Sequence, residues 1–334
     1  MKRISAAVIA LFMLGAATPL AQAPGRWITN KFAPLPMPAE EYTAVTANNR
    51  LYLIGGNRGN SKEWPRTVIE YDLATDKWTT KKPVPFSGDH MAAAALGGRI
   101  YLFGGQAEGG VNKPLNASWE YDPAADAWKM LAPMPSGRTA AVAVEAGGRI
   151  FLIGGNAAGG LTVGTNDAYS PAANTWESRT AMPTPRNHPA AGAVGGKIYA
   201  IGGRLAAPNI GGFLASNTDV VEEYDPAANS WRAMNKMPTA RSGHGWTTYQ
   251  GRIYVAGGEM RDSHMDAIFR DVEVFDPATG EWYKLPPMPT ARHGVNLAAA
   301  NGMLHAIGGH IAFAATGEKE LHTPAHEVFE FSQK

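Results

Sequence analysis

Four arginines recur at one position of a repeated pattern and are the residues best suited to bind an anion. Each stands sixteen residues before a Gly-Gly pair that ends a short apolar run, and the four are Arg138, Arg186, Arg241 and Arg292. A guanidinium group presents a planar fork of N–H donors that matches a carboxylate or a phosphate. If the repeats surround an axis, equivalent side chains point the same way, so we expect the four groups to converge.

Histidines and other polar residues accompany these arginines. The histidines follow the arginine-equivalent position by one to three residues, at His90, His188, His244 and His293. The residue directly after each Gly-Gly pair is also polar, and the six are Asn57, Gln106, Asn156, Arg204, Glu259 and His310. Such side chains can donate and accept hydrogen bonds, and they are candidates for the same site.

The arginines also have a structural interpretation. A guanidinium group at this position can donate to backbone carbonyl groups of a neighbouring repeat. Four clustered positive charges cost stability unless negative charge compensates them. Glu41, Glu108 and Glu259 are internal candidates for that compensation. A bound carboxylate or phosphate is the external candidate, and the sequence leaves both interpretations open.

The elements that position these residues form a sixfold repeat. Successive Gly-Gly pairs start 49, 50, 48, 55 and 51 residues apart, from Gly55 to Gly308. In five repeats an aromatic residue precedes a tryptophan by seven positions, as Tyr121 precedes Trp128. A period near fifty matches a propeller blade of four strands. We expect the glycines to bend the strand ends and the aromatic residues to fill the space between blades.

These features resemble the kelch repeat, whose signature is the Gly-Gly pair, the aromatic residue and the tryptophan. The resemblance covers residues 27–331 and implies an all-β fold, a six-bladed propeller with four antiparallel strands per blade. It also implies that the two classes of polar position line the mouth of the central channel. The ligand-binding residues predicted in this way are Arg138, Arg186, Arg241, Arg292, His188, His244, His293, Asn57, Gln106, Asn156, Arg204, Glu259 and His310.

The two ends of the repeat array are expected to meet in one blade. Trp27 has no repeat before it, and the sixth repeat reaches Phe331 without a tryptophan of its own before Lys334. We predict that the segment around Trp27 supplies the outer strand of the last blade. This arrangement closes the ring and leaves no open sheet edge.

One face of the disc is expected to carry the function. The turns between strands one and two and between strands three and four are short and uniform. The loops between strands two and three vary, and the longest lie within 204–219, 259–270 and 310–325. Variable loops on a rigid scaffold usually carry recognition. Apolar side chains available there for a protein or polymer partner are Phe213, Met260, Met265, Phe269 and Phe313.

Residues 1–23 have the pattern of a secretory signal peptide. Lys2 and Arg3 precede an apolar run, and Ala21-Gln22-Ala23 supplies a small-residue cleavage motif. Cleavage after Ala23 would leave 24–334 as a single propeller, periplasmic or secreted, with no further membrane span. The formal net charge would fall from +1 to −1, because the removed segment contains two basic residues and no acidic ones. We therefore expect no general attraction to nucleic acid.

The sequence excludes some kinds of catalytic and metal chemistry. It contains no cysteine, which excludes disulfides and the cysteine-dependent copper chemistry of galactose oxidase, another kelch-type propeller. Carboxylates and histidines are dense in repeats five and six, but their spacing matches no metal motif, so we expect no metal or other cofactor. The polar cluster that contains them is Glu259, Arg261, Asp262, His264, Asp266, His310, His322 and His326. The Glu, Asp and His pattern that binds iron in some plant kelch propellers would require ligands at Ser263 and Ala267.

Three functions remain. The first is a monomeric binding protein for a small anion, an acidic sugar or an acidic peptide. The second is an enzyme similar to the periplasmic kelch sialic-acid mutarotases, in which an arginine holds the sugar carboxylate and Glu259 or a histidine moves protons. The third is a protein-interaction scaffold without a small ligand. The fold cannot choose among them, because propellers host many functions.

Overall fold

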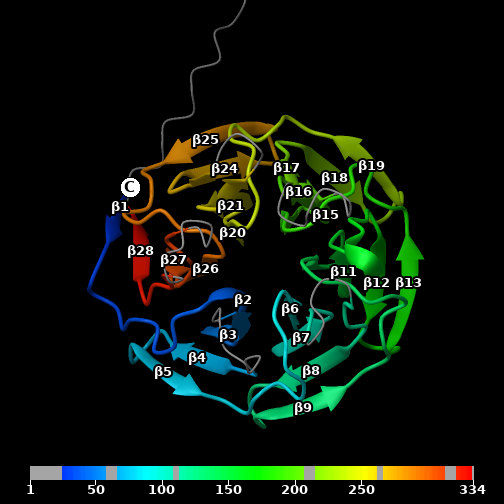
Figure 1. Cartoon of the computed structure of the whole chain (residues 1–334), viewed down its shortest axis with the longest axis horizontal. Helices are drawn as coiled ribbons and strands as arrows, with labels where there is room; N and C mark the ends of the chain where they lie inside the picture. The colour runs from blue at the N-terminus through cyan, green and yellow to red at the C-terminus, as the bar shows by residue number, and fades with distance from the viewer. Residues whose placement is uncertain are drawn as a thin grey trace, which may run out of the picture.

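The computed structural model describes residues 25–57, 66–107, 113–206, 215–261, 266–312 and 321–332. Six four-stranded antiparallel sheets stand as blades around a central channel, and the chain passes through them in order (Figure 1). Within each blade the first strand lies at the channel and the fourth lies at the rim. The predicted all-β six-bladed propeller is confirmed.

The strands of the blades have similar lengths. The first blade contains β2 (Glu40–Ala47), β3 (Arg50–Asn57), β4 (Val68–Asp72) and β5 (Lys77–Thr80). The second contains β6 (Ala92–Leu96), β7 (Arg99–Phe103), β8 (Ser118–Asp122) and β9 (Ala127–Met130). The third contains β10 (Val142–Ala146), β11 (Arg149–Ile153), β12 (Asn166–Ser170) and β13 (Thr175–Arg179). The fourth contains β14 (Ala190–Val194), β15 (Lys197–Ile201), β18 (Val221–Asp225) and β19 (Ser230–Ala233).

The last two blades and three small elements complete the fold. The fifth blade contains β20 (Gly245–Tyr249), β21 (Arg252–Ala256), β24 (Val272–Asp276) and β25 (Glu281–Leu285). The sixth contains β26 (Asn296–Ala300), β27 (Met303–Ile307), β28 (His326–Phe331) and β1 (Gly25–Ile28). Two hairpins, β16 (Arg204–Ala206) with β17 (Ala215–Asn217) and β22 (Glu259–Arg261) with β23 (Asp266–Ile268), extend the loops between strands two and three. A short 3-10 helix covers Ala158–Gly160.

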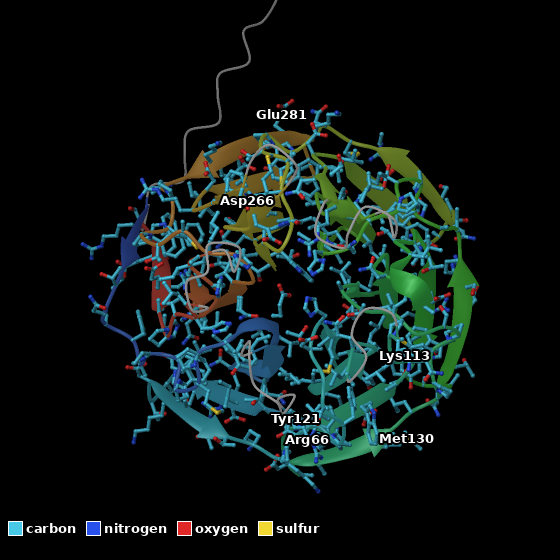
Figure 2. The ribbon with its side chains drawn as sticks, viewed as in Figure 1. Arg66, Lys113, Tyr121, Met130, Asp266 and Glu281 are labelled. Carbon is cyan, nitrogen blue, oxygen red and sulfur yellow. The ribbon has the colours of Figure 1, made fainter. Side chains whose placement is uncertain are left out.

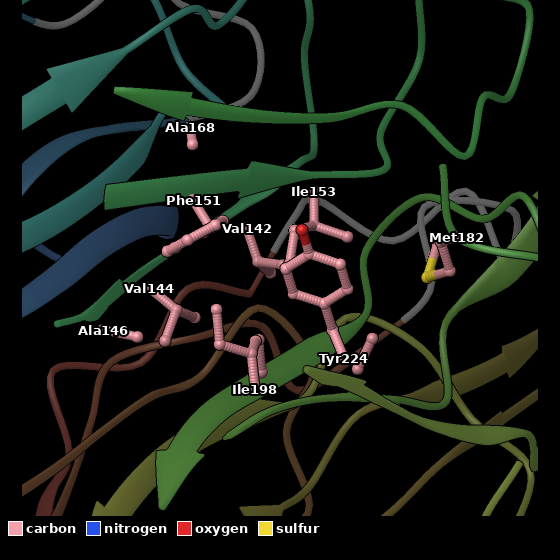
Figure 3. Close-up of a cluster of buried hydrophobic side chains, with 11 residues drawn as sticks. Val142, Val144, Ala146, Phe151, Ile153, Ala168, Met182, Ile198 and Tyr224 are labelled. Carbon is pink, nitrogen blue, oxygen red and sulfur yellow. The ribbon is translucent and has the colours of Figure 1, made fainter. Parts of the chain in front are cut away.

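The hydrophobic core lies between the blades. The second strand of each blade is buried on both faces, since it packs between neighbouring sheets, and its sequence is therefore almost continuously apolar. Figure 3 shows one such cluster, in which Phe151 and Ile153 of the third blade contact Ile198 and Tyr224 of the fourth. Each blade can bury its faces only against its neighbours, which makes the closed ring the stable unit.

The Gly-Gly pairs end the second strands in a conformation that suits only glycine. Gly104 and Gly105 have φ angles of 62° and 94°. A Cβ atom on Gly104 would lie 2.2 Å from the carbonyl oxygen of Arg138 in the next blade. The pair therefore allows the neighbouring backbone to approach closely, as the repeat pattern predicted.

Neighbouring blades are latched together at the rim by the repeated tryptophans. Each indole N–H donates to a backbone carbonyl oxygen of the preceding connection, as Trp176 does to Ala132 at 3.0 Å. In the first four blades an Asp or Asn five residues after the aromatic residue adds two further hydrogen bonds to this contact. Asn174, for example, accepts from the Tyr169 hydroxyl and from the Ala132 amide. The sequence did not lead us to expect this contact, although the spacing between the aromatic residue and the Asp or Asn repeats.

The N-terminal strand closes the ring as predicted. β1 pairs with β28 in antiparallel register, with Trp27 opposite Phe329. The two rings meet edge to face with centroids 5.4 Å apart. The Trp27 indole N–H donates to the Pro286 carbonyl at 2.8 Å, the same contact that the other tryptophans make. Trp27 therefore acts as the tryptophan of the sixth blade.

Some expectations fall outside the described residues. They are the signal peptide at 1–23, parts of the three long loops, and the side chains of Phe213, Met265 and Phe313. In the described ranges, no helix is both long and apolar enough to cross a membrane.

A buried histidine pair joins the sixth blade to the N-terminal segment. His326 donates its Nδ1–H to the Ala33 carbonyl at 3.1 Å, so its Nε2 accepts from Nδ1 of His305 at 2.9 Å. Burial lowers the pKa of His305 to about 3 and that of His326 to about 4. Both rings are therefore neutral in the folded protein at any pH above about 5.

This pair predicts a loss of stability in mild acid. In the unfolded chain both histidines bind protons below their ordinary pKa of about 6.5, so the free energy of unfolding falls as the pH drops below that value. At pH 5.5 each histidine should contribute a loss of about 1.4 kcal/mol relative to pH 7.5. Urea unfolding at the two pH values tests this. In His326→Asn, which keeps a donor toward Ala33, the loss should shrink by about 1 kcal/mol. An unchanged pH dependence would contradict this role.

Candidate functional site

The central channel is lined by the innermost strands of all six blades. It encloses a cavity of about 480 Å³. Its walls carry mainly small side chains, such as the alanines at 92–95 of β6. Glu41, His90 and His188 line this cavity where the chain enters the innermost strands, at one end of the channel.

One residue per blade forms a ring at that end, which we call the collar. Its members are Glu41, His90, Ala140, His188, Gly243 and Gly294, each two positions after the arginine-equivalent residue. All six have positive φ angles, from 50° to 59°. Hydrogen bonds between blades fix the ring in part: Ala140 N donates to His90 O, His188 N to Ala140 O, and Gly294 N to Gly243 O.

The residues after the Gly-Gly pairs lie next to the collar. Each pairs through backbone hydrogen bonds with the residue just before the collar position of its own blade. The pairs are Gln106 with Asp89, Asn156 with Thr139, Arg204 with Asn187, Glu259 with Ser242, and His310 with His293. Asn57 pairs in the same way with Glu40, although the side chains of these two lie outside the described residues. The structure therefore places the residues after the Gly-Gly pairs beside the collar in all six blades.

The four arginines do not converge at the channel mouth. Their side chains are fully buried inside their own blades, each against a carboxylate on the third strand. Arg186 reaches Glu222 at 2.8 Å, and Arg292 reaches Glu327 at 2.7 Å. The other two pairs are Arg138 with Asp167 and Arg241 with Glu273. Backbone carbonyl oxygens also accept from these guanidinium groups, as those of Ala306 and Gly308 do from Arg292.

A signal in the sequence identifies these ion pairs. The partner carboxylate always stands two residues before the aromatic residue that pairs with the blade's tryptophan. These aromatic residues are Tyr169, Tyr224, Phe275 and Phe329. In the first and second repeats, where Ala39 and Gly88 replace the arginine, the same position holds Ile69 and Trp119. Arginine and acid are thus present together or absent together, because a buried charge needs its partner. The internal compensation is supplied by these acids, and not by Glu41 or Glu259.

His244, one of the predicted ligand-binding residues, is buried, and so is His326 of the polar cluster in repeats five and six. His244 packs beside the Gly-Gly pairs of the fourth and fifth blades, and burial lowers its pKa to about 3. His326 lies in the buried pair with His305 and does not join His310 and His322. His310 instead contacts His293 and His322 edge to face, at centroid distances of 5.1 and 5.0 Å.

A polar cluster remains at the mouth, centred on Arg204. This guanidinium group, with a side chain 23% exposed, pairs with Glu259 of the next blade. It also lies 3.5 Å from Nε2 of His188, whose Nδ1 is 2.6 Å from the Asn187 side-chain oxygen. Burial, together with the charge of Arg204, holds the pKa of His188 well below its usual range. His188 is therefore a neutral ligand or acceptor at pH 7.

Exposed apolar side chains lie on the loops that carry this cluster's face of the disc. Among the described residues, five large hydrophobic side chains are exposed, and four of them lie in loops between strands two and three: Leu161, Leu205, Ile311 and Leu321. The fifth, Met130, lies at the outer edge of the disc (Figure 2). The predicted loop-rich face thus combines a polar centre with apolar loops.

Comparison with known proteins agrees with the repeat pattern and the fold. A family profile described as "KLHDC2/KLHL20/DRC7 Kelch-repeats domain" matches residues 26–181 and 129–309. The chain belongs to the kelch-repeat family. Kelch-like protein terF of Aspergillus terreus is 30% identical over 341 residues, which cover 94% of this chain and 72% of that protein.

Other kelch relatives match over shorter segments. Kelch-like protein 40 of Xenopus laevis is 32% identical over 111 residues, covering 33% of this chain and 17% of that protein. Kelch-like ECH-associated protein 1A of Danio rerio is 29% identical over 99 residues, covering 30% of this chain and 16% of that protein. The matched part of this kelch propeller thus spans less than a fifth of either relative.

Proposed function

We propose that this kelch propeller is an exported binding protein that captures a polypeptide segment at the collar face. The observation that carries the proposal is the surface pattern of that face. A polar centre lies around Arg204, and exposed leucine and isoleucine side chains stand on loops of the third, fourth and sixth blades. An extended peptide can place an acidic or amide side chain at the centre while its apolar side chains cover the loops.

The charges favour a peptide over a small anion. The four buried arginines are already neutralised inside the blades, which leaves Arg204 as the cation at the centre of the described mouth. A single guanidinium group shared with Glu259 holds a small anion weakly. Apolar contacts on the loops supply the additional binding energy, at about 25 cal/mol for each Å² buried.

A displayed random-peptide selection against the whole mature protein tests the proposal, because it favours no surface in advance. The selected peptides should bind Arg204→Met and Leu205→Ser with at least about tenfold lower affinity, a loss of about 1.4 kcal/mol each. Fluorescence anisotropy of labelled peptides gives the dissociation constants. The same preparation, secreted by a bacterial host, tests our inference of export: its mass should correspond to residues 24–334.

Matched controls keep the test specific. Arg149→Met removes an arginine of comparable exposure, paired with Glu177, from the first position of β11. Met130→Ser removes the exposed hydrophobic residue at the rim. Neither should change the affinity. Peptides that respond to these two variants but not to Arg204→Met would overturn the proposal.

A sugar-directed enzyme is the second candidate. The observation in its favour is that a cation, a carboxylate and an imidazole meet at Arg204, Glu259 and His188. An arginine can hold the carboxylate of a sugar acid, while the other two groups transfer protons. A rise in melting temperature with N-acetylneuraminate but not with galactose, in the absence of any mouth-directed peptide, would favour this function.

A further inference from the structure

Three collar residues from three blades carry metal-ligating side chains. One ligand atom from each of Glu41, His90 and His188 lies within 4.8 Å of the other two. Nε2 of His90 is 3.7 Å from a carboxylate oxygen of Glu41. The His90 and His188 rings meet edge to face with centroids 5.1 Å apart. We propose that these three residues bind a divalent transition-metal ion, with Zn²⁺ as the best fit.

The surroundings orient both imidazoles for this role. Nδ1 of His90 lies 2.8 Å from the buried carboxylate of Asp89, and Nδ1 of His188 lies 2.6 Å from the side-chain oxygen of Asn187. An oxygen acceptor at Nδ1 keeps the proton there, so that the lone pair of Nε2 is available to a metal. A histidine bound to carboxylate or amide oxygen in this way is the usual arrangement behind metal-ligating histidines.

The backbone holds the three side chains in place. Glu41, His90 and His188 have φ angles of 54°, 51° and 50°. A left-handed conformation is unfavourable for residues other than glycine, and the surrounding structure must enforce it. Gly243 and Gly294 occupy the same position in the fifth and sixth blades. The collar thus accepts glycine, yet three adjoining ligand side chains are retained at its strained positions.

The ligand set indicates the ion. Two histidines and one carboxylate form the protein ligands of many zinc sites that keep a fourth position open. In a tetrahedral zinc site the ligand atoms lie about 3.3 Å apart. Side-chain movements of roughly 1 Å would bring the ligand atoms of Glu41, His90 and His188 to this spacing. The open position would face the channel cavity.

Arg204 competes with the ion. Its guanidinium group lies 3.5 Å from Nε2 of His188, the atom that the metal would use. Binding therefore requires Arg204 to leave His188 while keeping its ion pair with Glu259. Arg204→Met should consequently bind zinc more tightly than the wild type, by severalfold. A weaker affinity in this variant would argue against His188 as a ligand.

Isothermal titration of the tag-free mature protein with Zn²⁺ tests the site without any peptide, so it can fail or succeed independently of the proposed function. We expect one ion per chain with micromolar or tighter affinity. His90→Asn, His188→Asn and Glu41→Gln should each weaken binding by about 100-fold, and Asp89→Asn by about tenfold. Asparagine is chosen because it tolerates a left-handed backbone.

His293→Asn is the matched control, because His293 lies at the same mouth but outside the ligand set. It should bind zinc like the wild type. Zinc should also raise the melting temperature of the wild type and of His293→Asn, but not that of the three ligand variants. Circular dichroism of each variant without zinc verifies folding. No binding by the wild type, or equal weakening in His293→Asn and the ligand variants, would overturn the proposal.

Discussion

Deletion of residues 25–32 from the mature protein is expected to lower the midpoint of thermal unfolding by about 5 °C or more. The deletion removes β1 and with it the Trp27 contacts to Phe329 and to the Pro286 carbonyl. Loss of one large packed aromatic side chain costs about 3–5 kcal/mol. With an unfolding entropy of about 2.1 cal/mol/K per residue, each kcal/mol shifts the midpoint of a chain of this size by about 1.5 °C. Differential scanning calorimetry measures the shift.

The same deletion should also expose an unpaired strand. β28 loses its partner and becomes an open edge, so the truncated protein should self-associate in light-scattering measurements. A synthetic peptide of residues 25–32, added in trans, should restore part of the lost stability. Deletion of residues 1–24 alone is the control and should leave the midpoint unchanged. If the longer deletion behaves like the shorter one, β1 does not close the ring in solution.

Breaking one buried ion pair is expected to cost more than replacing the whole pair. Arg292→Met leaves the Glu327 carboxylate buried without its guanidinium partner, with only the Thr290 hydroxyl left donating to it among its side-chain contacts described here. Removal of one partner from such a pair typically costs about 3–5 kcal/mol. Replacement of both partners by apolar residues is often nearly neutral. Arg292→Met/Glu327→Leu should therefore be more stable than Arg292→Met by about 2 kcal/mol or more.

The chain itself supplies the precedent for this double change. In the first blade the two positions hold Ala39 and Ile69, both fully buried. Urea unfolding of the wild type, the two single variants and the double variant gives the coupling energy. Equal stability of the double variant and Arg292→Met would show that Glu327 is not the partner on which Arg292 depends. Because no ligand is added in this measurement, the coupling energy reports the structural role of Arg292 and not a role in binding an anion.

Most of the fold could be predicted because it is a property of the repeat. The spacing of Gly-Gly pairs and tryptophans determines the number of blades, and Trp27 determines how the ring closes. The repeat also implies that the residues after the Gly-Gly pairs have the same neighbours in every blade. These features follow because equivalent residues occupy equivalent places in every blade, and because the last sheet of a closed ring needs a partner for its outer edge.

The direction of the side chains could not be predicted in the same way. Arg241 and His188 stand only a few positions apart in equivalent segments, yet one points into its blade and the other to the channel. The difference arises from the backbone: the collar residue has a positive φ, and the arginine two positions earlier faces a third-strand acid. Sequence periodicity specifies equivalence between blades, and does not specify which way a side chain faces.

The sequence by itself determined the architecture, the closing strand and the face on which variable loops gather. Only the tertiary structure decided that four arginines are neutralised inside the blades and that Glu41, His90 and His188 meet at the collar. These three residues are 49 and 98 positions apart along the chain. Closure of the ring brings them together, because side chains from separate blades become neighbours only where all six converge on the channel.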